Sequence, residues 1–313
     1  MHDRDDLPKI IGMIFELKEN GFCRFLSQAD RPFSELCSFR IGGPISYTLS
    51  PLDTPSLCLL ARELHESGLP YLVLGAGSNV LPPDEGYPGV VLLTASLRRI
   101  HRSGERLTVL CGTPLSECIL FAAKHDLFGM ERLYGIPGTV GGAIFMNAGA
   151  HGSAIADRLE SASVYDPATD TVRTLTREDM RFSYRHSVLQ EQKHRILLSA
   201  TFSLSCGSKE EILQRIQHVV RLRAASQPLQ YPSAGSAFRR PRPDVEVWRL
   251  IDACGLRGYR VGGAQISEKH AGFIVNCQNA TAADVRELIT IARREVLHTF
   301  GILLIPEIEM IGK

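Results

Sequence analysis

The sequence contains no long apolar run and no excess of charge of either sign. No stretch approaches the roughly 18 consecutive apolar residues that suggest a membrane-spanning helix. Its 35 Lys and Arg residues nearly balance its 34 Asp and Glu residues, which leaves a formal charge of +1. Such a balance provides no global field that would attract nucleic acid or an anionic membrane. Any site for an anion must therefore be a local one.

The N-terminus and the cysteines exclude further classes of protein. The first 21 residues place charges on both sides of a short apolar patch and lack the apolar core and cleavage site of a secretory signal. The cysteines show neither the spacing of a zinc site nor the density of a disulfide framework. We therefore expect a reduced, cytoplasmic protein without a metal site, in which several cysteines are small buried apolar side chains. The eight cysteines are at positions 23, 37, 58, 111, 118, 206, 254 and 277.

Several well-known functional motifs are also absent. The chain has no HExxH, no P-loop GK[ST], no GxSxG, and no strip of basic and aromatic residues typical of single-stranded nucleic-acid binding. We expect a small-molecule substrate, with no nucleic-acid, membrane or obligate protein partner.

The hydrophobic pattern predicts helices and strands in no strict alternation. Residues 54–70 are expected to form a helix that starts at Thr54-Pro55 and stops at Gly68, and residues 71–75 a short buried strand. Past residue 205 the pattern shifts, which suggests a domain boundary. This mixture favours an α+β fold. Further helices are expected around 115–122, from about 209, around 247–254 and after a capping Thr281, and strands within 158–205.

Two glycine-rich loops lie in the first half of the chain. LVLGAGSNVL at 72–81 is not a dinucleotide fingerprint, because Val80 stands where GxGxxG requires glycine or alanine. GIPGTVGGAIFMNAGAHG at 135–152 has bulk only at residues 144–146. A single such loop is most often a tight turn. Two loops that combine small residues with Ser, Thr or Asn favour a large phosphate-bearing cofactor, because their backbone N–H groups can bind phosphate oxygens.

Seven motifs occur in the order typical of one family of flavoenzymes. They are LVLGAGSNVL, GMERLYGIPGTVGGAIFMNAGAHG, FSYRHS, PSAGSAF, LIDACGLRG, GGAQISEKHAGFIVN and IPEIEMIG. From about residue 37 to its C-terminus the chain resembles the UDP-N-acetylenolpyruvoylglucosamine reductase (UDP-N-acetylmuramate dehydrogenase, MurB) family. The short interval between Arg185 and Ser236 is similar to the family branch that lacks an inserted tyrosine-bearing loop.

The resemblance implies an α+β fold with a two-lobed, PCMH/VAO-like FAD-binding region and a smaller α+β substrate-binding domain. The FAD-binding region is expected at residues 1–205, with lobes at about 1–92 and 93–205. The substrate-binding domain is expected at 206–313, with its C-terminal segment returning to the active site.

The resemblance also implies a reaction of peptidoglycan synthesis in cell-wall biogenesis. NADPH gives a hydride to non-covalently bound FAD, and the reduced flavin passes it to C3 of the enolpyruvyl group of UDP-N-acetylglucosamine enolpyruvate. A protein acid then protonates C2, which yields UDP-N-acetylmuramate. The expected cofactor-binding residues are Gly75, Ala76, Gly77, Ser78, Asn79, Gly135, Gly138, Thr139, Gly142, Ala143, Asn147, Ala148 and Gly149.

Three residues match the catalytic residues of this family. Ser236 in PSAGSAF is the implied proton donor, although a Gly-Ser turn would explain it in isolation. A hydroxyl can serve as the acid only where protonation of a basic carbanion is downhill. Arg185 in FSYRHS is implied to stabilise carboxylate or enolate charge, although most arginines form surface salt bridges. Glu307 in IPEIEMIG is the implied C-terminal acid, and Glu309 is the poorer match.

Five further residues are candidates for substrate binding. The two arginines among them suit a diphosphate but stand where the family commonly has lysine and asparagine. A pair of arginines is usually solvated, a lone histidine is more often structural, and a tyrosine here is as often a packing residue. Cys37-Ser38 also replaces the usual asparagine-threonine pair. The candidates are Tyr184, Arg239, Arg240, Lys269 and His270.

Two other functions stay open. One is a different oxidase or dehydrogenase of the same FAD-binding fold, although the first loop lacks the histidine that often tethers flavin in those enzymes. The other is a degenerate, non-catalytic flavin-binding homologue. The oxidase would leave the PSAGSAF and IPEIEMIG motifs unexplained. The presence of Ser236, Arg185 and Glu307 together argues against the degenerate homologue, which the unusual pair Arg239-Arg240 keeps open.

Overall fold

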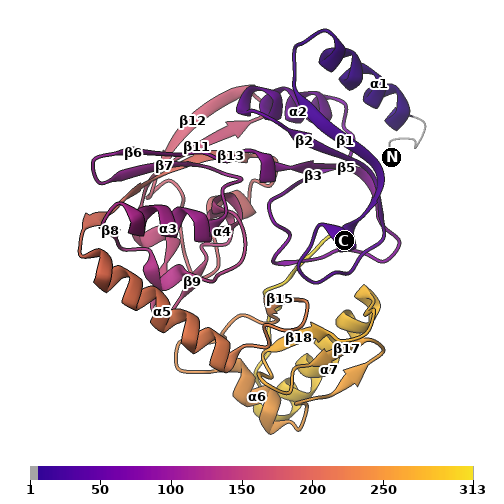
Figure 1. The fold of residues 1–313 in the computed structure, drawn as a ribbon. Helices are drawn as coiled ribbons and strands as arrows, with labels where there is room; N and C mark the ends of the chain where they lie inside the picture. Colours follow the sequence, from indigo (N-terminus) through magenta and orange to yellow (C-terminus); the bar gives the residue numbers. More distant parts are fainter. Residues whose placement is uncertain (1–5, 313) are drawn as a thin grey trace. The chain divides into compact units, whose positions relative to one another are not determined.

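The chain folds into two compact units, each built from segments that are distant in the sequence (Figure 1). The computed structural model describes residues 6–312. Unit 1 contains the residues up to Ala29, Ser46–Ala76 and Pro88–Val220; unit 2 contains Asp30–Ile45, Gly77–Tyr87 and the residues from Arg221 onward. The chain therefore passes from unit 1 to unit 2 within the first glycine loop. These units are defined by packing. The predicted boundary near residue 205 instead separates FAD binding from substrate binding, and it stays a prediction.

An antiparallel sheet with strand order β12-β11-β13-β7-β6 forms a large part of unit 1. The central strand β13 is mostly buried, whereas the edge strands β6 and β12 are mostly exposed and polar. Exposed polar edges discourage pairing with another chain. The strands are β6 (Ile100–Ser103), β7 (Arg106–Leu110), β11 (Leu159–Asp166), β12 (Thr171–Thr176) and β13 (Ile196–Ser203).

A second sheet has the strand order β1-β2-β5-β3, with β3 and β5 parallel. The helix α2 (Thr54–Glu66) follows β2 in the chain. Its first turn is capped by Asp53, whose carboxylate accepts a hydrogen bond from the Ser56 N–H at 2.8 Å. The helix α1 (Asp6–Glu19), which the sequence pattern did not predict, precedes the sheet. The strands are β1 (Phe25–Pro32), β2 (Pro44–Pro51), β3 (Tyr71–Leu74) and β5 (Tyr87–Leu93).

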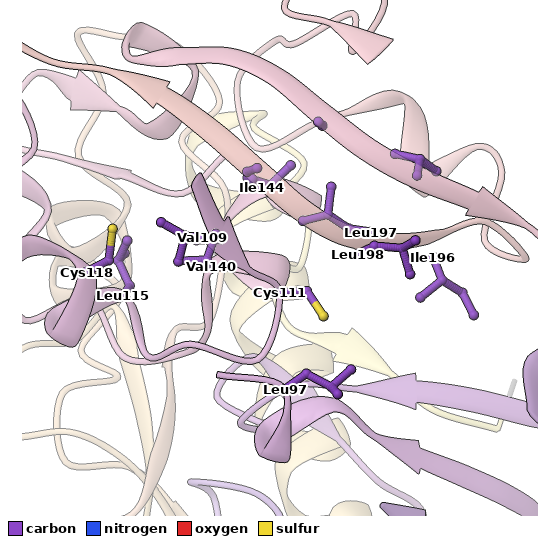
Figure 2. Close-up of a cluster of buried hydrophobic side chains, with 14 of the residues drawn as sticks. Leu97, Val109, Cys111, Leu115, Cys118, Val140, Ile144, Ile196, Leu197 and Leu198 are labelled. Carbon is purple, nitrogen blue, oxygen red and sulfur yellow. The ribbon is translucent and has the colours of Figure 1, made fainter. Parts of the chain in front are cut away.

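The core of unit 1 includes α3 (Leu115–Lys124) and the short helix α4 (Val140–Phe145), as Figure 2 shows. Cys111 and Cys118 lie in this core, and burial raises the pKa of each thiol to about 12. Both thiols therefore stay protonated near neutral pH and serve as apolar packing groups. Two small antiparallel pairs and one helix follow: β8 (Leu127–Phe128) with β14 (Ser205–Cys206), β9 (Gly149–Ala150) with β10 (Ser153–Ala154), and α5 (Lys209–Ser226).

Unit 2 is built on an antiparallel sheet of order β15-β18-β17-β16 and the helices α6 (Val247–Ala253) and α7 (Ala282–Phe300). Alternate residues of the sheet, such as Ala264, Ile266 and Ile274, join the apolar face of α7 in a separate core. The parallel pair of β4 (Val80–Leu81) and β19 (Glu309–Met310) also belongs to this unit. The sheet strands are β15 (Ser233–Ser236), β16 (Arg260–Val261), β17 (Ala264–Ile266) and β18 (Phe273–Asn276).

The structure confirms the predicted α+β class and most predicted elements. The capping box at the start of α7 is present, with Thr281 and Asp284 bonded in both directions. The helix α4 is a difference, because the sequence indicated only a loop there. Each cysteine is a free thiol, and four of the eight are buried. Within residues 6–312, every helix is too short or too polar to span a bilayer.

Candidate functional site

The two glycine-rich loops meet within unit 1 at Gly75 and Thr139. A Cβ atom on Gly75 would lie 2.5 Å from the Thr139 Oγ1 atom. The Thr139 hydroxyl in turn caps α4 by accepting a hydrogen bond from the Gly142 N–H at 3.3 Å. Glycine at position 75 is therefore required for close approach of the loops, as expected if together they bind one cofactor.

The second loop is paired with the segment that follows β7. The Val140 N–H donates to the Thr113 carbonyl, and the Gly141 N–H donates to the Cys111 carbonyl, each at 2.8 Å. Gly138 has a φ of 126°, a conformation that favours glycine. Beyond α4, Asn147 is also in the left-handed region, and its side-chain amide donates to the Ser183 carbonyl at 2.8 Å. The predicted cofactor residue Asn147 thus also holds the neighbouring Arg185 segment.

Arg185 lies in the tight turn 183–186 of unit 1, whose end residues Ser183 and His186 form an antiparallel bridge. Its guanidinium donates to the Gly149 carbonyl at 2.9 Å, and it lies 5.1 Å from the centre of the Tyr184 ring. The predicted catalytic arginine is therefore placed directly against the second glycine loop.

Ser236 ends strand β15 of unit 2 and is exposed. Gly235, directly before it, has a φ of 80°, and a Cβ atom there would meet no atom within 4 Å. The glycine is thus required by backbone conformation rather than by crowding. Among the described residues, the Ser236 hydroxyl makes no hydrogen bond in the structure. The Gly-Ser turn and the accessible hydroxyl expected of a proton donor are therefore both present at Ser236.

Glu307 lies beside the Ser236 segment in the same unit. Phe238 and Pro306 form an antiparallel bridge, and the Glu307 N–H donates to the Ala237 carbonyl at 2.9 Å. The predicted donor and the predicted C-terminal acid therefore belong to neighbouring, hydrogen-bonded segments, although 71 positions separate them in the sequence. Glu309 lies two positions further on, at the start of β19.

The two arginines after this motif differ in their surroundings. Arg240 forms an ion pair with Glu246, with an N–O distance of 2.8 Å. The Nε atom of Arg239 is buried and has no hydrogen-bond partner among the described residues. An unpaired buried guanidinium nitrogen is unfavourable unless a ligand or water completes it. Arg239 is therefore the better candidate to bind an anionic group.

Lys269 and His270 make contacts within unit 2. The Lys269 Nζ atom donates to the Ala224 carbonyl at 2.5 Å. The His270 Nδ1 atom accepts a hydrogen bond from the Gly272 N–H at 3.1 Å, and its ring packs against Trp248 and Phe273. Burial lowers the pKa of His270 below its usual 6.5, and the Arg257 charge adds to this effect. A neutral imidazole with an acceptor Nδ1 fits these contacts.

A polar pocket of about 500 Å³ opens beside Lys269. Sequence reasoning singled out only Lys269 among its residues, although most of the others lie in the same motif, GGAQISEKHAGFIVN. Gln230, Tyr231 and Arg260 lie outside every motif, so only the tertiary structure brings them to this pocket. Within residues 6–312, no group of His, Cys, Asp and Glu side chains is arranged to hold a metal ion. The pocket is lined by Gln230, Tyr231, Arg260, Gln265, Ser267, Glu268, Lys269 and Val275.

Two family profiles match separate parts of the chain. Residues 45–176, which include both glycine loops, match the profile described as "FAD binding domain". Residues 227–311 match the profile "UDP-N-acetylenolpyruvoylglucosamine reductase, C-terminal domain".

Whole proteins of the same description are similar to nearly the entire chain. The UDP-N-acetylenolpyruvoylglucosamine reductase of Caldicellulosiruptor bescii is 44% identical over 95% of this chain and 93% of its own length. That of Thermotoga maritima is 42% identical over 87% of this chain and 94% of its own. The crystal structure of the reductase from Thermus caldophilus has a TM-score of 0.76 and 36% identity, covering 92% of this chain and 99% of that one.

Proposed function

Since the chain belongs to the UDP-N-acetylenolpyruvoylglucosamine reductase family, we propose that Ser236, Arg185 and Glu307 are its catalytic residues. The protein is an NADPH-dependent flavoprotein oxidoreductase that reduces UDP-N-acetylglucosamine enolpyruvate to UDP-N-acetylmuramate for peptidoglycan synthesis. Its substrate is a nucleotide sugar, and its cofactor is FAD.

The residues of the two glycine loops fit FAD. The contact of Gly75 with Thr139 leaves no room for a side chain at position 75, and loops of such small residues let their backbone approach the phosphate groups of a cofactor. When bound, FAD supplies the hydride transfer between NADPH and the enolpyruvyl group. We assign the predicted cofactor residues of both loops to its binding, with Thr139 and Asn147 also fixing the shape of the second loop.

Ser236 is the proposed source of the proton at C2 of the enolpyruvyl group. Its exposed hydroxyl is free of competing protein hydrogen bonds among the described residues, and Gly235 leaves open space beside it. The neighbouring Glu307 segment supports this role, because a carboxyl group near the substrate carboxylate helps to direct charge and protons. This neighbourhood of Ser236 and Glu307 is the observation that most favours the reductase mechanism over a degenerate homologue.

Arg185 is the proposed counter-charge for the substrate carboxylate, because a guanidinium is always protonated and has several donors. For the diphosphate, the buried Nε of Arg239, which lacks a partner within residues 6–312, supports that residue over Arg240, which is paired with Glu246. The polar pocket beside Lys269 also contains Arg260 and has room for part of a nucleotide sugar. Tyr184 and His270 are retained as weaker substrate-binding candidates.

We place the FAD-binding function in residues 1–205 and substrate binding in 206–313, as the two matched profiles support. A cytoplasmic location is proposed as well, because free thiols persist in a reducing compartment.

An anaerobic two-step experiment tests this function. NADPH added to the purified flavoprotein should abolish the absorbance of oxidised flavin, and UDP-N-acetylglucosamine enolpyruvate should restore it with formation of UDP-N-acetylmuramate. Recovery of the absorbance with air but not with this substrate would instead identify an oxidase of the same fold.

A further inference from the structure

Besides Asn147, a glutamine also fastens the turn that contains Arg185 to the second glycine loop. Gln190 ends the short 3-10 helix Val188–Gln190. Its Nε2 atom donates to the Arg185 carbonyl at 3.0 Å and to the Phe145 carbonyl at 2.8 Å. Phe145 is the last residue of α4, two residues before Asn147. One side-chain amide therefore bridges the arginine turn and the end of α4.

The backbone of Arg185 requires such a restraint. Its φ is 55°, in the left-handed region that arginine rarely adopts. Such conformations persist at functional sites only where the surrounding structure maintains them. Gln190 bonds to the carbonyl of Arg185 itself, while the Arg185 guanidinium donates to the Gly149 carbonyl at 2.9 Å. Backbone and side chain of Arg185 are thus both tied to the loop 145–149.

We propose that Gln190 is a positioning residue, which sets the place of the Arg185 guanidinium relative to the glycine loop that binds FAD. The inference rests on the role of Arg185 given under the proposed function. Gln190 acts through Arg185, since it donates to the backbone carbonyls of Arg185 in the turn and of Phe145 at the end of α4. Its loss should impair the step in which the substrate carboxylate must be oriented, and leave the reaction of NADPH with the flavin unaffected.

Ser187 provides a matched control. Its hydroxyl donates to the same Phe145 carbonyl at 2.8 Å but makes no hydrogen bond to Arg185 among the described residues. Ser187 and Gln190 therefore share the anchoring of α4, and only Gln190 adds the bond to Arg185.

The test compares the two half-reactions in Gln190→Met and Ser187→Ala. Methionine retains the length of the side chain but cannot donate a hydrogen bond. Gln190→Met should slow reoxidation of the flavin by saturating substrate about tenfold or more, because small displacements of a binding group are costly. Reduction of the flavin by NADPH in Gln190→Met should stay within about twofold of the wild-type rate. Both half-reactions of Ser187→Ala should also stay within about twofold of the wild-type rates. Adding Gln190→Met to Arg185→Ala should cause no further slowing, because the two residues act as a unit.

Three outcomes overturn the proposal. They are an unchanged reoxidation rate in Gln190→Met, equal slowing of both half-reactions, and undiminished slowing by Gln190→Met when Arg185 is already alanine. If Gln190→Met does not fold, Gln190→Leu, which also lacks a hydrogen-bond donor and introduces no charge opposite the two carbonyls, replaces it under the same criteria. If Arg185→Ala itself reoxidises normally, the proposed role of Arg185 fails first. If substrate reoxidises the flavin slowly in Arg185→Ala but at the normal rate in Gln190→Met, only the positioning role of Gln190 is rejected.

Discussion

The side-chain amide of Asn79 donates a hydrogen bond to the main-chain carbonyl of Glu307 at 3.1 Å. The Glu309 N–H donates in turn to the Asn79 carbonyl at 2.9 Å, and the parallel pair of β4 and β19 continues from there. An asparagine predicted to bind the cofactor therefore also holds the segment of the proposed C-terminal acid.

Replacement of Asn79 should weaken this hold on Glu307. Asn79→Ala removes one partly buried hydrogen bond, which should lower the free energy of unfolding by about 1 kcal/mol. Asn79→Asp should lower the free energy of unfolding further, because a carboxylate cannot donate a hydrogen bond and would face the Glu307 carbonyl. Denaturant unfolding measures the first effect, and reoxidation of the flavin by substrate measures displacement of Glu307. Equal stability of the aspartate variant and the wild type would contradict this arrangement.

Ser236→Ala should separate the two half-reactions. Without the hydroxyl, reoxidation of the flavin by substrate should fall by about 10²- to 10⁴-fold, the usual contribution of a positioned acid. Reduction by NADPH should persist at its normal rate. Stopped-flow absorbance follows both steps. Ser233→Ala, in the same strand β15, is the matched control and should retain both rates. Equal survival of both half-reactions in Ser236→Ala would exclude it as the donor.

The two arginines at 239 and 240 should respond differently to substitution. Arg239→Ala removes the guanidinium that we propose to bind the diphosphate, whose buried Nε has no hydrogen-bond partner among the described residues, so the substrate Kd should rise about tenfold or more. Arg240→Ala breaks a solvent-exposed ion pair with Glu246, which is usually worth less than about 1 kcal/mol of stability. The substrate dependence of the reoxidation rate gives both Kd values. A larger effect at Arg240 would reverse the assignment.

Gly75→Ala should lower FAD occupancy. The new Cβ atom would lie 2.5 Å from the Thr139 Oγ1 atom and would force the two glycine loops apart. Gly12→Ala is the control, since Gly12 is exposed within α1 and has no atom within 4 Å of an added Cβ. That change should stabilise the protein by about 0.5–1 kcal/mol through helix propensity. The ratio of flavin to protein absorbance after gel filtration is the measurement; full occupancy in Gly75→Ala would show that the contact is not required.

His270 should make stability dependent on pH. Its folded pKa lies below the usual 6.5, because burial disfavours the imidazolium and the nearby Arg257 charge adds to this effect. The unfolded chain therefore binds more protons as pH falls, and the stability present above about pH 6.5 is lost as pH falls toward the folded pKa. Unfolding of the wild type and of His270→Gln, measured from pH 7.5 to 5, should show a shallower slope in the variant. Parallel slopes would mean that His270 does not contribute.

Local signals in the sequence determined the ends of several elements. The Thr281–Asp284 box starts α7, and Asp53 caps α2 beside the predicted start at Thr54. Such caps are hydrogen bonds across three residues, so the sequence contains both partners side by side. The helix α4 was missed for the opposite reason. Its glycines disfavour a helix, and the burial of Val140 and Ile144 in the core, together with the cap by Thr139, stabilises it.

The sequence also indicated which residues belong to the candidate site, but only as separate motifs. Their neighbourhoods were decided by tertiary structure: Gly75 contacts Thr139, and the segments of Ser236 and Glu307 are joined by an isolated bridge between Phe238 and Pro306. The restraint of Arg185 by Gln190 is of the same kind, because it depends on where α4 ends. A residue's type and its near neighbours determine its backbone preference and its chemistry. Its partner across a sheet or between loops depends on how the whole core packs, which no local pattern specifies.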